Sequence, residues 1–244
     1  EYQDRRRAFE ACLAMLDRVL VTSSEQASVF EKRVTNPLRL HFLQRSRATI
    51  RADKPRARTA AVRREGLTFV ALNIVNPAKG YEILTSAFAA LARDFPGIQL
   101  NLYGLRHAVF PGIRQFGPYD DSDLDSMIAD ADFGILPSIW PEAFGYVGPE
   151  MLSRGLPVIA SNVGAMPDYV ADGENGLLFD PSKPRALEDA IRKLIADPDL
   201  RRRVWEGAAG GQRRYITIEE HLDRLTGLYD EVMAEGAAPL VSKT

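Results

Sequence analysis

The chain has 244 residues, 45% of them hydrophobic, and a formal net charge of −2 at pH 7. This length is sufficient for one large core or one and a half domains, and the small net charge argues against a general polyanion-binding protein. The single cysteine, Cys12, excludes an internal disulfide and fits a reducing compartment.

Membrane and export signals are absent from the sequence pattern. No apolar run approaches the roughly 20 residues that span a bilayer, and the start of the chain does not resemble a signal peptide. We therefore expect a cytoplasmic protein without a transmembrane segment, with peripheral attachment to a membrane as the alternative.

The first 64 residues predict two helices, a strand and a basic segment. Apolar residues recur at helical spacing over residues 5–20, and LDRVLVTSSEQASVFEKR predicts a short strand, a Ser/Thr cap and a second helix. Residues 45–64 hold eight basic residues, with Asp53 as the only acid. This composition predicts a solvated linker, with attraction to anionic lipid or nucleic acid as the alternative. No aromatic residue interrupts the run, which disfavours a base-stacking surface.

From residue 67 the pattern alternates between strands and helices. The expected strands are LTFVALNIV, IQLNLYG, IRQFG, DFGILP, PVIAS and GLLF. The expected helices run over residues 79–93, 122–131 and 185–196, and a last one begins at the capping box formed by Thr217 and Glu220. This alternation predicts a doubly wound, mostly parallel sheet with helices on both faces and right-handed connections.

Residues 137–176 form the stretch around which the rest is organised. Glu142 and Glu150 are separated by seven residues that include Phe144, Gly145 and Gly148. A helix that starts near Gly145 would present free N–H groups to an anion. Glu150 would lie about one turn further on, where a carboxylate accepts hydrogen bonds from vicinal hydroxyls. Phosphate and a sugar diol together describe a nucleoside diphosphate.

The segment PEAFGYVGPEMLSRGLPVIAS resembles the E-x7-E signature of retaining glycosyltransferases of the GT-B fold, the glycosyltransferase family 4 or glycosyl transferases group 1 type. The resemblance extends from Lys79–Gly80 through GLLFDP to about residue 234. It implies a Rossmann-like sheet as the C-terminal half of a GT-B fold, preceded by an N-terminal α/β remnant.

The resemblance also divides the chain. It implies that residues 1–44 are the tail of an N-terminal acceptor-type domain, with a helical extension as the alternative. It also implies that residues 45–65 are a basic linker. Residues 66–214 become the nucleotide-sugar-binding domain, and residues 215–244 a crossover helix and tail.

The resemblance assigns roles to individual residues. It places Lys79 at the diphosphate and Glu142 by the donor sugar, as the catalytic pair. The expected donor-binding residues are Glu150, Phe144, Gly145, Tyr146, Gly104, Gly117, Pro118, Tyr119, Gly164 and Ala165. Asp168 is either the acid that often follows this small pair or a helix cap.

One departure concerns the turn before Lys79. Many members of the family have Gly-Arg there, and this chain has Asn73-Ile74. The missing cation would cost on the order of 2–4 kcal/mol of transition-state stabilisation, and Arg106 is a possible substitute. This departure therefore bears on catalysis rather than on nucleotide binding.

The histidines and acids do not form a hydrolytic or metal site. His41, His107 and His221 are scattered without a carboxylate, Ser or Cys partner at useful spacing. We expect a metal-independent, retaining transferase without a cofactor that binds a UDP- or GDP-sugar. Its acceptor would be a saccharide or a lipid-linked saccharide, held by an N-terminal domain in the same or another chain. The alternative is a non-catalytic sugar-nucleotide-binding or assembly subunit; a Rossmann dehydrogenase is disfavoured because no G-x-G-x-x-G follows the first strand.

Overall fold

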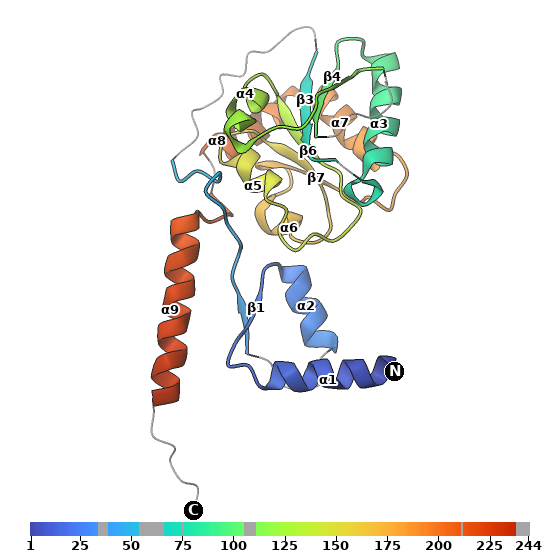
Figure 1. The fold of residues 1–244 in the computed structure, drawn as a ribbon. Helices are drawn as coiled ribbons and strands as arrows, with labels where there is room; N and C mark the ends of the chain where they lie inside the picture. Colours follow the sequence, from blue (N-terminus) through green and yellow to red (C-terminus); the bar gives the residue numbers. More distant parts are fainter. Residues whose placement is uncertain (34–38, 54–65, 75, 105–110, 211, 238–244) are drawn as a thin grey trace, which may run out of the picture.

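A computed structural model describes residues 1–33, 39–53, 66–74, 76–104, 111–210 and 212–237. Its largest part is a six-stranded sheet with helices on both faces (Figure 1). The strands are β3 (Thr68–Leu72), β4 (Gln99–Tyr103), β5 (Ile113–Gln115), β6 (Phe133–Leu136), β7 (Val158–Ser161) and β8 (Gly176–Phe179). The helices that cover them are α3 (Tyr81–Asp94), α4 (Leu124–Ala129), α5 (Val147–Leu152), α6 (Met166–Tyr169), α7 (Ala186–Ala196) and α8 (Pro198–Gly210).

The sheet has the order β5-β4-β3-β6-β7-β8, and every neighbouring pair is parallel. Counted from β3, this is the 3-2-1-4-5-6 order of doubly wound sheets, in which ligands bind where the order reverses. The reversal lies between β3 and β6, which pair with Phe69 opposite Phe133. The expected α/β class with a mostly parallel sheet is confirmed.

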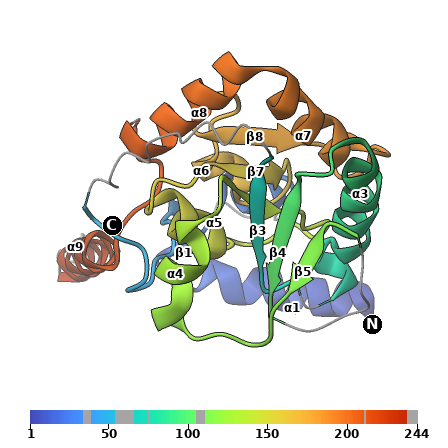
Figure 2. The ribbon, with the colours of Figure 1, turned by 90° about the horizontal axis from the view of Figure 1, so that it is seen from above.

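Residues of β3 alternate between the two cores on either side of the sheet. Phe69 and Ala71 belong to the core under α3, α7 and α8, whereas Val70 and Leu72 belong to the core under α4, α5 and α6. Figure 2 shows these two sets of helices on the two sides of the strands. A fully buried side chain such as Phe69 contributes about 1.5–3 kcal/mol to the free energy of folding. The packed sheet in turn fixes the strand ends that carry the site.

The N-terminal part forms a smaller α/β unit, which here means α1 (Tyr2–Ala14), β1 (Val19–Val21), α2 (Ser24–Arg33) and β2 (Leu40–Phe42). β1 and β2 pair in parallel, with Val19 opposite Leu40. In Figure 1 this unit lies below the large sheet, with α2 towards α6, and α9 (Ile218–Ala237) runs beside it. Arg39 of the small unit donates to Glu235 of α9 at 3.0 Å.

Helix boundaries differ from expectation at a few points. The first helix ends at Ala14, because Val19 and Leu20 are in β1. Helix α3 begins at Tyr81, since Lys79 lies in a preceding 3-10 turn, Pro77–Lys79. A second 3-10 turn, Asp121–Asp123, precedes α4. The capping box before α9 is present: the Thr217 N–H donates to Glu220 at 2.8 Å, and the Glu220 N–H donates to the Thr217 hydroxyl at 3.3 Å.

The start of the basic segment is packed on the large domain, which here means the six-stranded sheet with helices α3 to α8. Ile50 is 3% exposed and belongs to the core under α4, α5 and α6. The Thr49 carbonyl accepts a hydrogen bond from Arg154 at 2.8 Å. The interpretation of a solvated segment is therefore wrong for Thr49 and Ile50. Composition shows that the segment is rich in charge, but it does not show which of its residues pack on the domain. Residues 54–65 lie outside the described part.

Within the described residues, no helix has the length and apolar character required to cross a membrane.

Candidate active site

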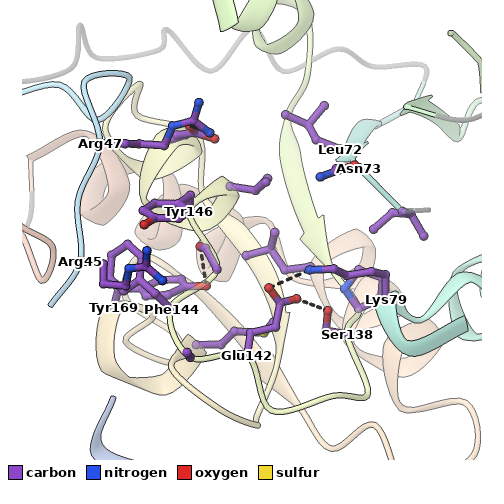
Figure 3. A pocket seen from close by; sticks show the side chains of 18 of the residues that line it. Arg45, Arg47, Leu72, Asn73, Lys79, Ser138, Glu142, Phe144, Tyr146 and Tyr169 are labelled. Atoms are coloured by element: carbon purple, nitrogen blue, oxygen red, sulfur yellow. Dashed lines mark hydrogen bonds and ion pairs between the residues drawn. The ribbon is translucent and has the colours of Figure 1, made fainter. Parts of the chain in front are cut away.

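A cavity of about 320 Å³ opens at the carboxyl ends of β3 and β6, where the strand order reverses. Its walls come from the turn after β3, the loop between β6 and α5, and the segment before residue 50. Figure 3 shows the side chains that line it. Glu142, Glu150 and Lys79 all line this one cavity, so the fold brings together three residues that are up to 71 positions apart in the sequence.

Glu142 lies at the centre of a small polar group. Its Oε2 is 2.8 Å from the Lys79 Nζ, and its Oε1 accepts a hydrogen bond from the Ser138 hydroxyl. These contacts are drawn as dashed lines in Figure 3. The Lys79 and Glu142 side chains are 33% and 18% exposed, so the pair remains open to a ligand. Ser138 is a site residue that the sequence reasoning did not find.

Lys79 reaches the cavity because α3 starts very close to the end of β6. Gly80 has φ +78°, and a Cβ there would lie 1.8 Å from the Pro137 carbonyl oxygen. Only glycine fits such a position. Asn76 accepts from the Lys79 N–H at 3.1 Å and closes the turn. The close approach of these two backbones therefore positions Lys79 against Glu142.

Gly164 and Ala165 do not line the cavity, but they contact the backbone of Glu142. The Ala165 N–H donates to the Glu142 carbonyl at 2.9 Å. A Cβ at Gly164, where φ is +61°, would lie 2.5 Å from the Glu142 nitrogen and carbonyl oxygen. The structure thus gives both residues a positioning contact to the Glu142 loop.

Glu150 is on α5 and is only 2% exposed. Its Oε1 accepts from the Thr49 hydroxyl and lies 3.3 Å from Nη1 of Arg47. Among the described residues, Oε2 accepts no hydrogen bond, which leaves one carboxylate oxygen for a ligand. α5 begins at Val147, two residues after Gly145, because Gly145 is in a left-handed turn with φ +74°.

Two arginines of the cavity wall come from the segment before the large domain. Arg47 also pairs with Asp121, and the guanidiniums of Arg45 and Arg47 lie 5.5 and 5.7 Å from the centre of the Tyr146 ring. From the sequence, both are expected in a linker. The Arg-x-Arg spacing was visible, but its proximity to residues about 100 positions later was not.

Aromatic side chains complete the walls. Phe144 is buried and packs edge-on against Tyr146 and the fully buried Tyr169, whose hydroxyl donates to the Gly145 carbonyl at 3.4 Å. Burial raises the pKa of Tyr169. Burial, with the charges of Glu150 and Asp121, raises the pKa of Tyr119 to about 12, so its hydroxyl remains a donor at neutral pH.

Besides Gly164 and Ala165, three more of the expected donor residues stand outside the cavity lining: Gly104, Gly117 and Pro118. The Gly104 N–H donates to the Gly117 carbonyl at 3.1 Å. The ring of Tyr103 packs edge-on against Tyr119. These turns therefore support Tyr119, which does line the cavity.

The remaining predictions fall at the turn after β3 and at α6. Asn73 and Ile74 line the cavity, and Asn73 has φ +59°, a conformation that asparagine tolerates better than most residues. Asp168 accepts from the Ser24 N–H at 2.9 Å and so contacts the small unit. Arg106 lies outside the described residues. In the part of the chain that the structure describes, no group of three His, Cys, Asp or Glu residues could hold a metal ion.

Comparisons with known proteins place the chain in a family. The family model described as glycosyl transferases group 1 matches residues 58–210. A D-inositol 3-phosphate glycosyltransferase of Corynebacterium glutamicum is 33% identical over 178 residues, which is 66% of this chain and 42% of that protein. This chain thus spans about two fifths of the length of that curated relative.

Two solved structures share the fold. Sucrose-phosphate synthase from Thermosynechococcus elongatus superimposes with a TM-score of 0.76 at 24% identity, covering 96% of this chain and 62% of that one. Anabaena HepE in complex with UDP-glucose superimposes with a TM-score of 0.73 at 18% identity, covering 94% and 68%. At these identities the likeness is one of fold.

Proposed function

Because this chain belongs to the glycosyl transferases group 1 family, we propose that it is the donor-binding, C-terminal half of a retaining GT-B glycosyltransferase. It would bind a UDP- or GDP-sugar without a metal ion. The observation that carries the proposal is that one cavity, at the strand reversal, contains Glu142, Glu150 and Lys79 together.

The ribose, the diphosphate and the sugar of a sugar nucleotide each have a matching group in this cavity. The free Oε2 of Glu150 suits the ribose diol, since a carboxylate oxygen accepts hydrogen bonds from hydroxyls. Lys79 is a point cation suited to the diphosphate. Glu142, 2.8 Å from Lys79, would meet the sugar beside its bond to the leaving phosphate. Anabaena HepE, which shares the fold, has been solved in complex with UDP-glucose, and this supports the same donor class here.

The proposed reaction is sugar transfer with retention of the anomeric configuration. In it, Lys79 stabilises the negative charge of the departing diphosphate, and Glu142 orients the sugar. The acceptor hydroxyl would belong to a saccharide or lipid-linked saccharide, bound by an N-terminal acceptor domain in the same or another chain. Closure of the two domains would exclude water and align the reacting atoms.

A second candidate is a non-catalytic sugar-nucleotide-binding subunit. It is favoured by the turn after β3, where Asn73 and Ile74 line the cavity without contributing a cation. Such a subunit would bind the sugar nucleotide but would not cleave it. Addition of an acceptor domain would therefore not speed the formation of free nucleotide.

Calorimetry with UDP, GDP, UDP-glucose and GDP-mannose tests the proposal. Without domain closure we expect dissociation constants of about 10 µM to 1 mM for at least one nucleotide series, unchanged by EDTA. Glu150→Ala removes a carboxylate of the cavity and should weaken nucleotide binding. Glu174→Ala is the matched control, because Glu174 does not line the cavity. Absence of nucleotide binding would contradict the proposed function. Binding that EDTA abolishes and Mg²⁺ or Mn²⁺ restores would contradict the metal-free site.

A further inference from the structure

The charged residues of the cavity are unequally partnered. Three cations and three carboxylates line it: Arg45, Arg47, Lys79, Asp121, Glu142 and Glu150. Lys79 is paired with Glu142 at 2.8 Å. Arg47 is paired with Asp121 and lies 3.3 Å from Glu150. Two of the three cations therefore already have acidic partners.

Arg45 is different. Among the described residues its guanidinium has no hydrogen bond and no ion pair, and it lies 5.5 Å from the centre of the Tyr146 ring. A cation over an aromatic face is held by the negative potential of that face, while its N–H groups remain available to a ligand. Figure 3 shows Arg45 on the side of the cavity opposite Lys79, with Glu142 between them.

We propose that Arg45 is a ligand-binding residue that supplies the second cation for the diphosphate of the sugar nucleotide. This inference rests on the proposed function. A diphosphate carries more negative charge than Lys79 neutralises, and Lys79 shares its charge with Glu142. The planar fork of an arginine matches phosphate oxygens with two parallel hydrogen bonds. Because Arg45 has no acidic partner among the described residues, no ion pair with them has to break when the phosphate binds.

Tyr146 has a defined part in this arrangement. The guanidiniums of both Arg45 and Arg47 lie over its ring, at 5.5 and 5.7 Å from the ring centre. The Arg47 guanidinium is also fixed by Asp121 and Glu150. For Arg45 the ring is the only contact of this kind that the described residues provide. Tyr146 is therefore a positioning residue for Arg45.

The test compares ligands that differ in phosphate number. Calorimetry on the 244-residue chain would use UDP and GDP, UMP and GMP, and uridine and guanosine. Loss of a charged hydrogen bond should make Arg45→Gln bind the diphosphate about 10-fold more weakly. The loss should be smaller for the monophosphate, and nucleoside binding should not change. Arg45→Lys should recover part of the loss, because it keeps the charge without the fork.

Two further variants separate a phosphate contact from a structural effect. Arg51→Gln removes an arginine of the same segment that pairs with Asp125 and does not line the cavity, so diphosphate affinity should be unchanged. Tyr146→Leu should weaken the diphosphate in the parent chain but much less in the Arg45→Gln background.

The outcomes are distinct. If the parent chain binds UDP or GDP and Arg45→Gln binds it equally well, the inference is wrong and the proposed function stands. The inference is also wrong if Arg45→Gln weakens nucleosides as much as diphosphates. If the parent chain binds no nucleotide, the proposed function fails and the inference fails with it.

Discussion

Replacement of Glu142 by alanine should change the affinity for free nucleotides and the affinity for nucleotide sugars in opposite directions. In the structure the Glu142 carboxylate lies 2.8 Å from the Lys79 Nζ. The proposed role of Lys79 is to bind the diphosphate, so this ion pair must loosen when a nucleotide binds. Glu142→Ala removes that competition. The same variant also removes the carboxylate that is proposed to meet the donor sugar.

The size of each effect follows from the exposure of the pair. At 33% and 18% exposure the ion pair is largely screened, and its loss should release about 1 kcal/mol at most. UDP or GDP should then bind equally or up to about fivefold more tightly. A lost hydrogen bond to a charged group costs about 1.5–3 kcal/mol. After subtraction of the Lys79 gain, UDP- or GDP-sugar should bind about 2- to 30-fold more weakly.

Paired calorimetric titrations with UDP and UDP-glucose, and with GDP and GDP-mannose, measure both effects on one preparation. Glu82→Ala is the matched control, because it removes a carboxylate three residues after Lys79 on α3 that does not line the cavity. A Glu142→Ala chain that loses the same affinity for free and sugar-bearing nucleotide would refute the assignment of Glu142 to the sugar.

Further predictions concern ribose, the Glu142 loop and the last helix. Glu150→Gln should weaken free nucleotide and nucleotide sugar alike, by about 10-fold, because both carry ribose; a loss confined to the sugar nucleotide would be inconsistent with ribose binding. Gly164→Ala should weaken the sugar nucleotide more than free UDP or GDP in the same titrations, because its Cβ would displace the Glu142 backbone. Thr217→Ala should lower the free energy of unfolding by about 1 kcal/mol through the lost cap, measured by thermal denaturation. The hydrogen bond from the Thr217 N–H, and then that from Arg213, lowers the pKa of Glu220 below its ordinary 4.5. The stability that ionised Glu220 contributes is therefore present above pH 4.5 and is lost as the pH falls through the folded-state pKa. Glu220→Gln should flatten the acid limb of the plot of stability against pH, and an unchanged limb would exclude this contribution.

The fold and half of the site follow from local sequence patterns. Strands β3, β6, β7 and β8 are short, largely apolar runs bounded by turn residues, and such runs are recognisable without tertiary information. Lys79 and Glu142 each follow a buried strand, β3 and β6. Because parallel strands end at the same edge of a sheet, the order of the strands brings these two residues together.

The other half of the site depends on contacts that no local pattern contains. Arg45, Arg47 and Thr49 precede the large domain, and composition gives them only the character of a charged segment. Their roles come from partners about 100 residues away: Tyr146 and Glu150. The burial of Ile50 in the core fixes this segment to the domain. A charge count cannot distinguish a solvated arginine from one that lies against a tyrosine ring.

The Glu142 loop differs from the rest of the cavity in what holds it. The hydroxyl of Thr22, in the small N-terminal unit, donates to the Ala143 carbonyl at 2.8 Å, and the Gly164 N–H donates to Glu25 of α2. Glu150, by contrast, is buried on α5 and is contacted by a segment that packs on the large domain itself. A shift of the small unit would therefore move the proposed sugar-binding carboxylate, while the proposed ribose carboxylate would remain in place. In this arrangement the proposed ribose contact belongs to the large domain, and the orientation of the sugar depends on how the two units are placed.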